Sequence, residues 1–396
     1  MTLVECDIRY YRNIIMPVDN TINFLSKLVS FPTISHTPTT EIAAYIAEFF
    51  ETLGFNVEHF KSVPESKQSN VICSIGPKGT KGLVLSGHMD VVPVEGQPWQ
   101  SDPFHLIEKD GKLFGRGSVD MKGFIAAAMS ALKAFKESDY KKELILIWTY
   151  DEEVGCYGSK LLSENIELLK RPLPEKCLIG EPTELNMICK HNGIASININ
   201  LKGKSAHSSQ PSWGINTISD AAKIVHEIDL FSQELKSMTD ELLSQDHADA
   251  YTTINVAAIN GGIAYNVIPE NCLIKVSIRP IPGVNIDELI KSLTDRIYHI
   301  SLQSSVTIDI IAKVPSLSTG QGTELEKQIG CHAKAKHSSA VAYATDGAHL
   351  QLMGMKPIIF GPGSINQAHK PNEFIDANEL VNFVPTIQKI VKEMCM

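Results

Sequence analysis

Apolar runs along this chain end repeatedly at side chains that can bind a metal ion. The segments are LVLSGHMD, GRGSVDMKG, LILIWTYDEE, LIGEP and PIIFGPGSINQAH, and the side chains are His88, Asp90, Asp120, Glu152, Glu153, Glu181 and His369. In α/β proteins, ligands gather at the carboxyl ends of the strands, so residues far apart in sequence converge there. Imidazoles and carboxylates are the ligands of two-metal hydrolytic sites. The sequence therefore predicts such a site at one edge of a sheet.

Length and composition limit the alternatives. A chain of 396 residues exceeds what one hydrophobic core usually serves, so we expect two domains. The net charge is -9 and no run of Lys or Arg could follow a phosphate backbone, so we expect no nucleic-acid partner. Eight scattered cysteines without a CxxC pair favour free thiols in a reducing cytoplasm. No segment reaches the roughly 18 apolar residues of a membrane span or matches a signal peptide, so we expect a cytoplasmic protein without membrane association.

The order of apolar patterns predicts an α/β fold. Helical periodicity over residues 19–31 and 40–54 is followed by short apolar runs that alternate with helical segments, which is typical of a helix-covered, mostly parallel sheet. Residues 191–313 instead read as strand, helix, two strands, helix and strand, the order of a ferredoxin-like α+β unit. We therefore expect a catalytic domain formed by residues 1–190 and 314–396, with residues 191–313 inserted as a dimerisation or lid domain.

Five of the polar residues have the chemistry of ligands for two neighbouring divalent ions. They are His88, Asp120, Glu153, Glu181 and His369. Each alone has an ordinary explanation, because a histidine in a glycine-rich loop is usually structural and an aspartate before a helix, such as Asp120, is usually an N-cap. Asp90 lies two residues beyond His88, on the same side of an extended segment. We expect its carboxylate to accept the other N–H of the imidazole and so to orient the ring.

The adjacent glutamates predict a division of roles. Successive side chains of an extended segment point to opposite sides, so Glu153 can bind a metal while Glu152 faces the substrate. Glu152 is then the candidate general base that takes a proton from water and returns it to the leaving nitrogen. His207 in GKSAHSSQP is a candidate donor to the tetrahedral oxyanion, although a surface histidine is an equal alternative. No HExxH, GxxxxGK[ST] or GxSxG motif supports a zincin, a nucleotide site or a serine hydrolase.

Four motifs together resemble a known family. SGHMDVVP, GRGSVDMKG, TYDEEVG and IGEP occur in the order and spacing of the di-zinc amidohydrolase and peptidase family of carboxypeptidase G2 and aminoacylase. The segments HNGIASININLKGKSAHSSQPSWGINTI and FGPGSINQAHKPNE are most similar to acetylornithine deacetylase within that family. The resemblance implies His88 and Glu181 on one zinc ion, Glu153 and His369 on the other, Asp120 as the bridge and Glu152 as the base. Co²⁺ or Mn²⁺ can substitute at such ligands.

The resemblance also implies a reaction and an assembly. The expected enzyme removes the acetyl group from N2-acetylornithine in arginine biosynthesis. Desuccinylation of N-succinyl-diaminopimelate, deacetylation of N-acetylcitrulline and dipeptide hydrolysis are alternatives, and a silent metal-stabilised scaffold is the alternative outside the enzymes. Family members form homodimers through the inserted domain, which implies that His207 reaches the site of a partner subunit. Asn255 and Arg279 match the contacts to the carboxylate of the small-molecule N-acyl amino acid substrate.

Overall fold

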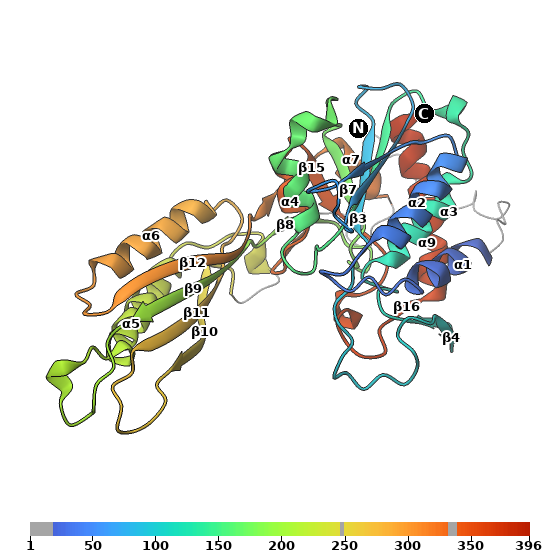
Figure 1. Ribbon diagram of the computed structural model, residues 1–396. Coiled ribbons are helices and arrows are strands. Elements are labelled where there is room, and N and C mark those ends of the chain that lie inside the picture. The colour runs from blue at the N-terminus through green and yellow to red at the C-terminus, as the bar shows by residue number, and fades with distance from the viewer. Residues whose placement is uncertain (1–18, 246–248, 332–338) are drawn as a thin grey trace. The chain divides into compact units, whose positions relative to one another are not determined.

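The computed structural model describes residues 19–245, 249–331 and 339–396. The chain forms two compact units (Figure 1). The first unit comprises the chain up to Cys189 together with Thr319–Ser339 and His349–Met396. The second comprises Lys190–Ser318 and Ala340–Ala348, so the chain enters it twice.

A twisted sheet forms the centre of the first unit. Its strands lie in the order β1, β2, β6, β3, β7, β15 and β8. Their bounds are β1 Asn56–Phe60, β2 Asn70–Ile75, β6 Leu144–Thr149, β3 Leu83–His88, β7 Lys176–Ile179, β15 Lys356–Ile359 and β8 Ile188–His191. The neighbours β6, β3, β7 and β15 are parallel, whereas β1, β2 and β8 pair antiparallel at the two sides. The predicted α/β class with a mostly parallel sheet is confirmed, with antiparallel strands only toward its edges.

The apolar runs form strands because both of their faces are covered. Every residue of β2, β3 and β6 is buried, as expected for strands with helices on both sides. The helices are α1 Asp19–Val29, α2 Thr40–Thr52, α3 Lys122–Leu132, α4 Tyr157–Glu164, α7 Glu324–Ile329, α8 Gly347–Leu352 and α9 Ala377–Cys395. Helices α1, α3 and α9 pack against one another (Figure 1). No helix in the described ranges is long and apolar enough to cross a membrane.

A small second sheet in this unit joins segments that are far apart in sequence. It consists of β4 Ile107–Lys109, β5 Lys112–Phe114 and β16 Phe374–Asp376, in the order β16, β5, β4. Phe374 lies opposite Phe114, and Asp376 lies opposite Lys112. Because β5 and β16 are antiparallel, the segment that follows β5 begins beside the segment that precedes β16.

The second unit is a four-stranded antiparallel sheet with two helices. Along the chain it contains β9 Ile194–Lys202, α5 Thr217–Leu235, β10 Thr253–Gly261, β11 Asn271–Arg279, α6 Ile286–His299 and β12 Ser305–Val314. The strand order β10, β11, β9, β12 is that of a βαββαβ unit. Alternate residues of β9 and β11 are buried with the apolar faces of α5 and α6, so both helices cover one face of the sheet. Two short strands, β13 Leu317–Ser318 and β14 Ser339–Val341, pair with β8.

Close contact between α3 and the end of β7 requires a glycine. The ring of Phe124, in the first turn of α3, packs directly on Gly180, and a Cβ added to Gly180 would lie 1.9 Å from the ring. Gly180 also donates its backbone N–H to Ser86 on β3, at 3.1 Å. This contact fixes the start of α3 against the sheet edge where β3 and β7 end.

Replacing this glycine should loosen the edge of the sheet. We expect Gly180→Ala to lower the free energy of unfolding of the first unit by about 1–3 kcal/mol, because the ring or the backbone must move. Gly320→Ala is the matched control, since nothing lies within 4 Å of the Cβ it would add. Denaturant unfolding of both variants tests this expectation. Equal stability of Gly180→Ala and the unaltered protein would contradict it.

Candidate metal centre

Three neighbouring parallel strands deliver polar side chains to the same edge of the sheet. His88 is the last residue of β3 and lies opposite Thr149, the last residue of β6. Glu152 and Glu153 follow β6, and Glu181 follows β7. Because β6, β3 and β7 run in the same direction, their carboxyl ends coincide, as the sequence pattern predicted.

Two other predicted residues arrive from loops rather than strand ends. Asp120 lies six residues beyond the end of β5 at Phe114 and two residues before α3, so the expectation that it ends a strand is wrong. It is not the helix N-cap either, because Met121 holds that position without a side-chain cap. His369 follows a 3₁₀ turn well beyond β15, and its backbone has a positive φ of 62°.

The five predicted ligands form two clusters that share Asp120. The first contains His88, Asp120 and Glu181, and the second contains Asp120, Glu153 and His369. In the first, His88 Nε2 lies 3.0 Å from Asp120 Oδ1 and 3.8 Å from Glu181 Oε1. In the second, His369 Nε2 lies 3.2 Å from Asp120 Oδ2 and 2.9 Å from Glu153 Oε2. Each cluster therefore takes a different oxygen of Asp120.

These distances suit a metal ion in each cluster. Ligand atoms about 2 Å from a tetrahedral zinc ion lie about 3.3 Å from one another. The measured separations of 2.9 to 3.8 Å scatter around that value. One nitrogen and two carboxylate oxygens per cluster is also a donor set that zinc and similar divalent ions accept. The residues thus fit a dinuclear centre, and their role as ligands remains a proposal.

The electrostatics of the clusters favour positive charge. Burial opposes the charged form of His88, but its hydrogen bond to Asp120 and the charge of Glu181 keep its pKa well above the usual range. Hydrogen bonds to Asp120 and Glu153 raise the pKa of His369 to about 10. Burial, followed by the charge of Asp120, raises the pKa of Glu153. A raised histidine pKa and a raised carboxyl pKa both indicate an excess of negative charge nearby. A divalent cation would offset that charge.

Asp90 acts differently from the expectation. The main-chain carbonyl of Asp90, not its carboxylate, lies nearest to His88 Nδ1, at 3.0 Å against 3.6 Å for Oδ1. A carbonyl only accepts, so Nδ1 carries a proton, and Nε2 faces Asp120 and Glu181. The carboxylate instead accepts hydrogen bonds from Ser35 Oγ and from the backbone N–H groups of Glu152 and Glu153. Asp90 therefore positions the two glutamates as well as the imidazole.

A tight turn holds Glu152 beside the second cluster. The main-chain carbonyl of Glu152 accepts hydrogen bonds from the N–H groups of Gly155 and Cys156, at 3.0 and 2.9 Å. The side chain is half-buried, and the Cys156 thiol lies 3.7 Å from its Oε1. Glu152 belongs to neither of the two clusters that contain Asp120. Glu152 therefore lies beside the second cluster, whereas Glu153 belongs to it.

His207 lies in the second unit, on an exposed loop. Its Nδ1 accepts a hydrogen bond from the backbone N–H of Ser209 at 3.2 Å, and Ser209 Oγ is 2.8 Å from the same atom. A ring nitrogen that accepts carries no proton in the neutral imidazole, so Nε2 carries it. His207 therefore presents an N–H donor from its loop.

Asn255 and Arg279 lie on neighbouring strands of the second unit. Asn255 on β10 is opposite Ser277 on β11, and Arg279 is two residues beyond Ser277, so both side chains project from the face of the sheet that α5 and α6 leave uncovered. Burial lowers the pKa of Arg279. No carboxylate within the described ranges forms an ion pair with it.

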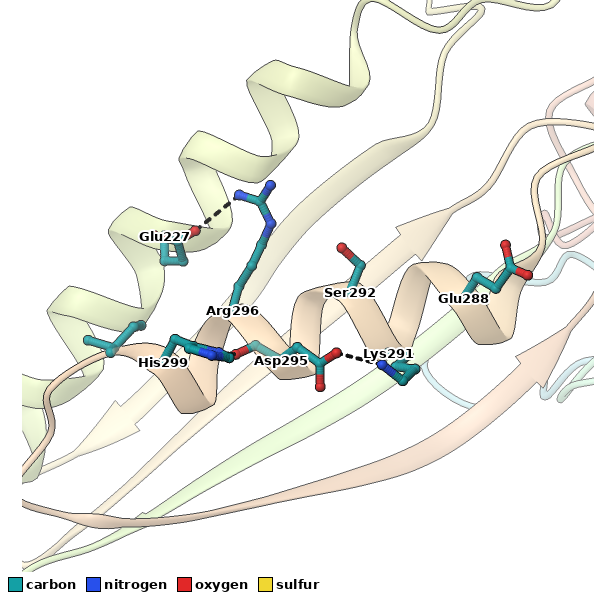
Figure 2. Close-up of a pocket in the computed structure, with 8 residues that line it drawn as sticks. Glu227, Glu288, Lys291, Ser292, Asp295, Arg296 and His299 are labelled. Atoms are coloured by element: carbon teal, nitrogen blue, oxygen red, sulfur yellow. Dashed lines mark hydrogen bonds and ion pairs between the residues drawn. The ribbon is translucent and has the colours of Figure 1, made fainter.

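A groove between α5 and α6 has a different character. Glu227, Glu288, Lys291, Asp295, Arg296 and His299 line it (Figure 2). Two ion pairs join residues of this lining, with Arg296 3.2 Å from Glu227 and Lys291 2.7 Å from Asp295, and Arg296 also pairs with Glu234 at 2.6 Å. It contains none of the predicted site residues, and the paired charges account for its polarity.

Some residues that shape the centre were missed from the sequence. Ser35 binds the Asp90 carboxylate, and Gln97, Arg116 and Glu373 contact the loops that carry Asp120 and His369. Arg116 had a weak signal, as a charged residue within the glycine-rich GRGSVDMKG. Gln97 and Glu373 had none, because their contacts depend on chain segments that meet only in the fold.

Comparison with known sequences identifies the chain's relatives. The sequence profile described as peptidase family M20/M25/M40 matches residues 84–393. That range includes every residue of the two clusters, together with Asp90, Glu152 and His207.

Solved structures with the same fold support the match. A tripeptidase from Staphylococcus aureus is 22% identical, with a TM-score of 0.73, covering 95% of this chain and 98% of that one. An M20 family metallo-carboxypeptidase from Sulfolobus solfataricus is 18% identical, with a TM-score of 0.77 and coverage of 94% and 99%. The Bacillus subtilis YXEP protein, described as a dinuclear metal-binding peptidase, is 15% identical, with a TM-score of 0.67 and coverage of 95% and 98%. At these identities the likeness establishes the fold.

The shared aspartate gives the centre a direct test. We expect the protein to bind two Zn²⁺ per chain, and Asp120→Asn to weaken both by more than the roughly 10–100-fold that loss of an outer partner costs. The reason is that the substitution removes the charge common to both clusters. Asp110→Asn is the control, because it changes an exposed turn residue whose positive φ asparagine tolerates. Titration of chelator-stripped protein with Zn²⁺ measures both constants, and unchanged binding by Asp120→Asn would refute the assignment.

Proposed function

The chain belongs to peptidase family M20/M25/M40, and on this premise we propose that it is a di-zinc amidohydrolase that removes the acetyl group from N2-acetylornithine. The observation that carries the proposal is the pair of clusters sharing Asp120, with Glu152 held beside them. The products would be ornithine and acetate, in a cytoplasmic step of arginine biosynthesis.

Each cluster would hold one ion. His88 and Glu181 would bind the first, Glu153 and His369 the second, and Asp120 both. Divalent ions held there supply the Lewis acidity that lowers the pKa of water and polarises a carbonyl. Zinc is the proposed metal, and the same nitrogen and oxygen donors would accept Co²⁺ or Mn²⁺.

Glu152 would move the proton. Hydrolysis of an amide needs a base to remove a proton from water and an acid to deliver it to the leaving nitrogen. Glu152 is next to Glu153, and the Asp90 carboxylate fixes the backbone N–H groups of both. Its main chain is therefore held in place, which would keep its carboxylate beside the second cluster, where a base is needed.

Residues of the second unit would bind the rest of the substrate. The Nε2–H of His207 would donate a hydrogen bond to the oxyanion that forms when the acetyl carbonyl becomes tetrahedral. Arg279 and Asn255 would bind the α-carboxylate of the amino acid, since a half-buried guanidinium is suited to a carboxylate partner. These roles support an N-acyl amino acid as the substrate class.

The acyl group and the amino acid are the finer part of the proposal. The segments around His207 and His369 resemble acetylornithine deacetylase, which favours acetylornithine over N-acetylcitrulline and N-succinyl-diaminopimelate. A peptidase is the second candidate, favoured by similar structures described as a tripeptidase and a metallo-carboxypeptidase. All of these substrates place an amide next to a free carboxylate or amine, so the same centre would act on each.

A substrate panel tests the proposal. We expect zinc-loaded protein to release amine from N2-acetylornithine faster than from N-acetylcitrulline, N-succinyl-diaminopimelate or small peptides, and a chelator to stop it. Glu152→Gln should keep both ions and lose about 10²–10⁴-fold in kcat, because it removes the base and no predicted ligand. Preference for a peptide would keep the centre and overturn the substrate, and full activity of Glu152→Gln would overturn the mechanism.

We also propose that two copies form a homodimer through the second unit. Large apolar side chains are exposed in the segments that flank His207, with Trp213 63%, Ile263 89% and Tyr265 107% exposed. The loop of His207 is bridged to the segment that follows Tyr265, through Val267. Apolar surface of this kind is typical of an interface. A second copy burying it would allow His207 to enter the partner's site.

Complementation between two inactive variants tests this arrangement. In a mixed dimer of Glu152→Gln and His207→Ala, the site that has Glu152 receives His207 from the other subunit, and one site of the pair is whole. Random mixing after dissociation should therefore restore about one quarter of the original activity, since about half of the dimers are mixed. Light scattering would check that the mixed proteins are dimers. If the mixed dimers then restore no activity, His207 would serve the site of its own subunit.

A further inference from the structure

Two loops carry the residues that complete the second cluster. The Asp120 loop, residues 115–121, follows β5, and the His369 loop, residues 361–373, precedes β16. The register of β5 with β16, with Phe114 opposite Phe374, brings the start of one loop to the end of the other. The Gly115 N–H donates to the Glu373 carbonyl at 3.0 Å and continues this pairing into the loops.

The Glu373 carboxylate holds the Asp120 loop. Its Oε1 accepts hydrogen bonds from the backbone N–H groups of Val119 and Asp120, at 3.0 and 3.2 Å. Its Oε2 accepts one from Arg116 Nη1 at 2.7 Å. Glu373 and Arg116 are each 1% exposed in their side chains. The Glu373 carboxylate is buried and accepts three hydrogen bonds, one of them from the Asp120 N–H. It therefore holds the main chain of Asp120 directly.

Arg116 extends the contact to a third segment. Its second terminal nitrogen donates to Gln97 Oε1 at 2.6 Å, and its guanidinium lies over the Trp99 ring, 5.0 Å from the centroid. The indole N–H of Trp99 donates to the same Gln97 oxygen at 3.0 Å. Because Arg116 and Trp99 both donate, the Gln97 atom that they contact must be the amide oxygen. The NH₂ group of Gln97 therefore points away from both.

The Gln97 NH₂ group holds the His369 loop. Nε2 donates to the main-chain carbonyl of His369 at 3.0 Å. The His369 side chain is 52% exposed, so packing does little to fix it. The hydrogen bond from Gln97 is thus a specific restraint on the residue that brings its imidazole to Asp120 and Glu153.

We propose that Gln97, Arg116 and Glu373 are positioning residues that set the two ligand loops in place for the second ion. The inference rests on the metal centre of the proposed function. The chain of contacts runs from the His369 carbonyl through Gln97, Arg116 and Glu373 to the N–H of Asp120. Displacement at either end changes the distance between His369 Nε2 and Asp120 Oδ2, and the second cluster depends on that distance.

A purely structural ion pair is the alternative, and the same unit offers one for comparison. Glu143 is a buried carboxylate that accepts from Arg171 at 3.1 Å and from the Gly79 N–H at 2.8 Å. It shares the chemistry of Glu373 and contacts no predicted ligand. Glu143→Gln is therefore a matched control for the general cost of disturbing a buried carboxylate.

The test uses Zn²⁺ titration of the chelator-stripped full chain, competed against a chromophoric chelator. The constant lost in His369→Ala identifies the second cluster, and the one lost in Glu181→Gln identifies the first. Gln97→Glu keeps the oxygen that Arg116 and Trp99 bind but replaces the donor to His369 with an acceptor. We expect it to weaken the second constant by about 10–100-fold and to leave the first unchanged. Glu373→Gln should weaken both, because Asp120 serves both clusters.

The outcomes separate this inference from the proposed function. Glu143→Gln should lower the melting temperature of the metal-free protein and leave both constants unchanged. Wild-type constants in Gln97→Glu and Glu373→Gln, or equal losses in Glu143→Gln, would overturn the positioning role while leaving the hydrolase intact. Two ions bound without hydrolysis of any substrate would overturn the function and leave the positioning role standing. A chain that binds no pair of ions would overturn both.

Discussion

Burial of negative charge around Asp120 is the constraint on which the rest of the centre depends. Asp120, Glu153 and Glu181 are carboxylates with side chains no more than 7% exposed, grouped around two imidazoles. Unpaired charges at this depth are costly, so the arrangement requires positive charge from histidine protons or from cations. Without a cation, the positive charge comes from protons on His88 and His369, and the pKa values of both are raised accordingly. Asp120 offers a separate oxygen to each cluster, which makes it the residue whose position matters most.

Two further buried carboxylates, Asp90 and Glu373, have a different task. Each accepts backbone N–H groups of residues in or beside the clusters: Asp90 those of Glu152 and Glu153, and Glu373 that of Asp120. A carboxylate offers several acceptor positions and can hold a loop that has no ladder of its own. Lys122 donates to the Phe31 carbonyl at 2.7 Å, and burial lowers its pKa to about 7 although the charges of Glu373 and Asp90 oppose that shift. The ligand loops are therefore ordered by buried charge more than by apolar packing.

The sequence was sufficient for the strands and for the types of residue at the sheet edge. Apolar runs of buried strands and the position of His88, Glu153 and Glu181 after them are local patterns, and parallel neighbours bring them together. Asp120 and His369 could be identified by residue type but not placed, since neither ends a strand. Spacing placed Asp90 beside the His88 imidazole, but it could not show that the main-chain carbonyl of Asp90 lies closer to that ring than its carboxylate does. Gln97 and Glu373 could not be predicted, because their partners are far away in sequence.

The chain's last segments close the centre. His369, Glu373 and β16 lie near the C-terminus, yet they contact Gln97, Arg116 and β5, all of which lie between β3 and β6 in sequence. Helix α9, which follows β16 directly, packs against α3, the helix that Asp120 precedes. The same segment thus supplies one proposed ligand, the carboxylate that holds the backbone of another, and a helix that packs against α3. If the second cluster binds a metal ion, as proposed, binding would be thermodynamically coupled to docking of the C-terminal segment, so whatever stabilises one would stabilise the other.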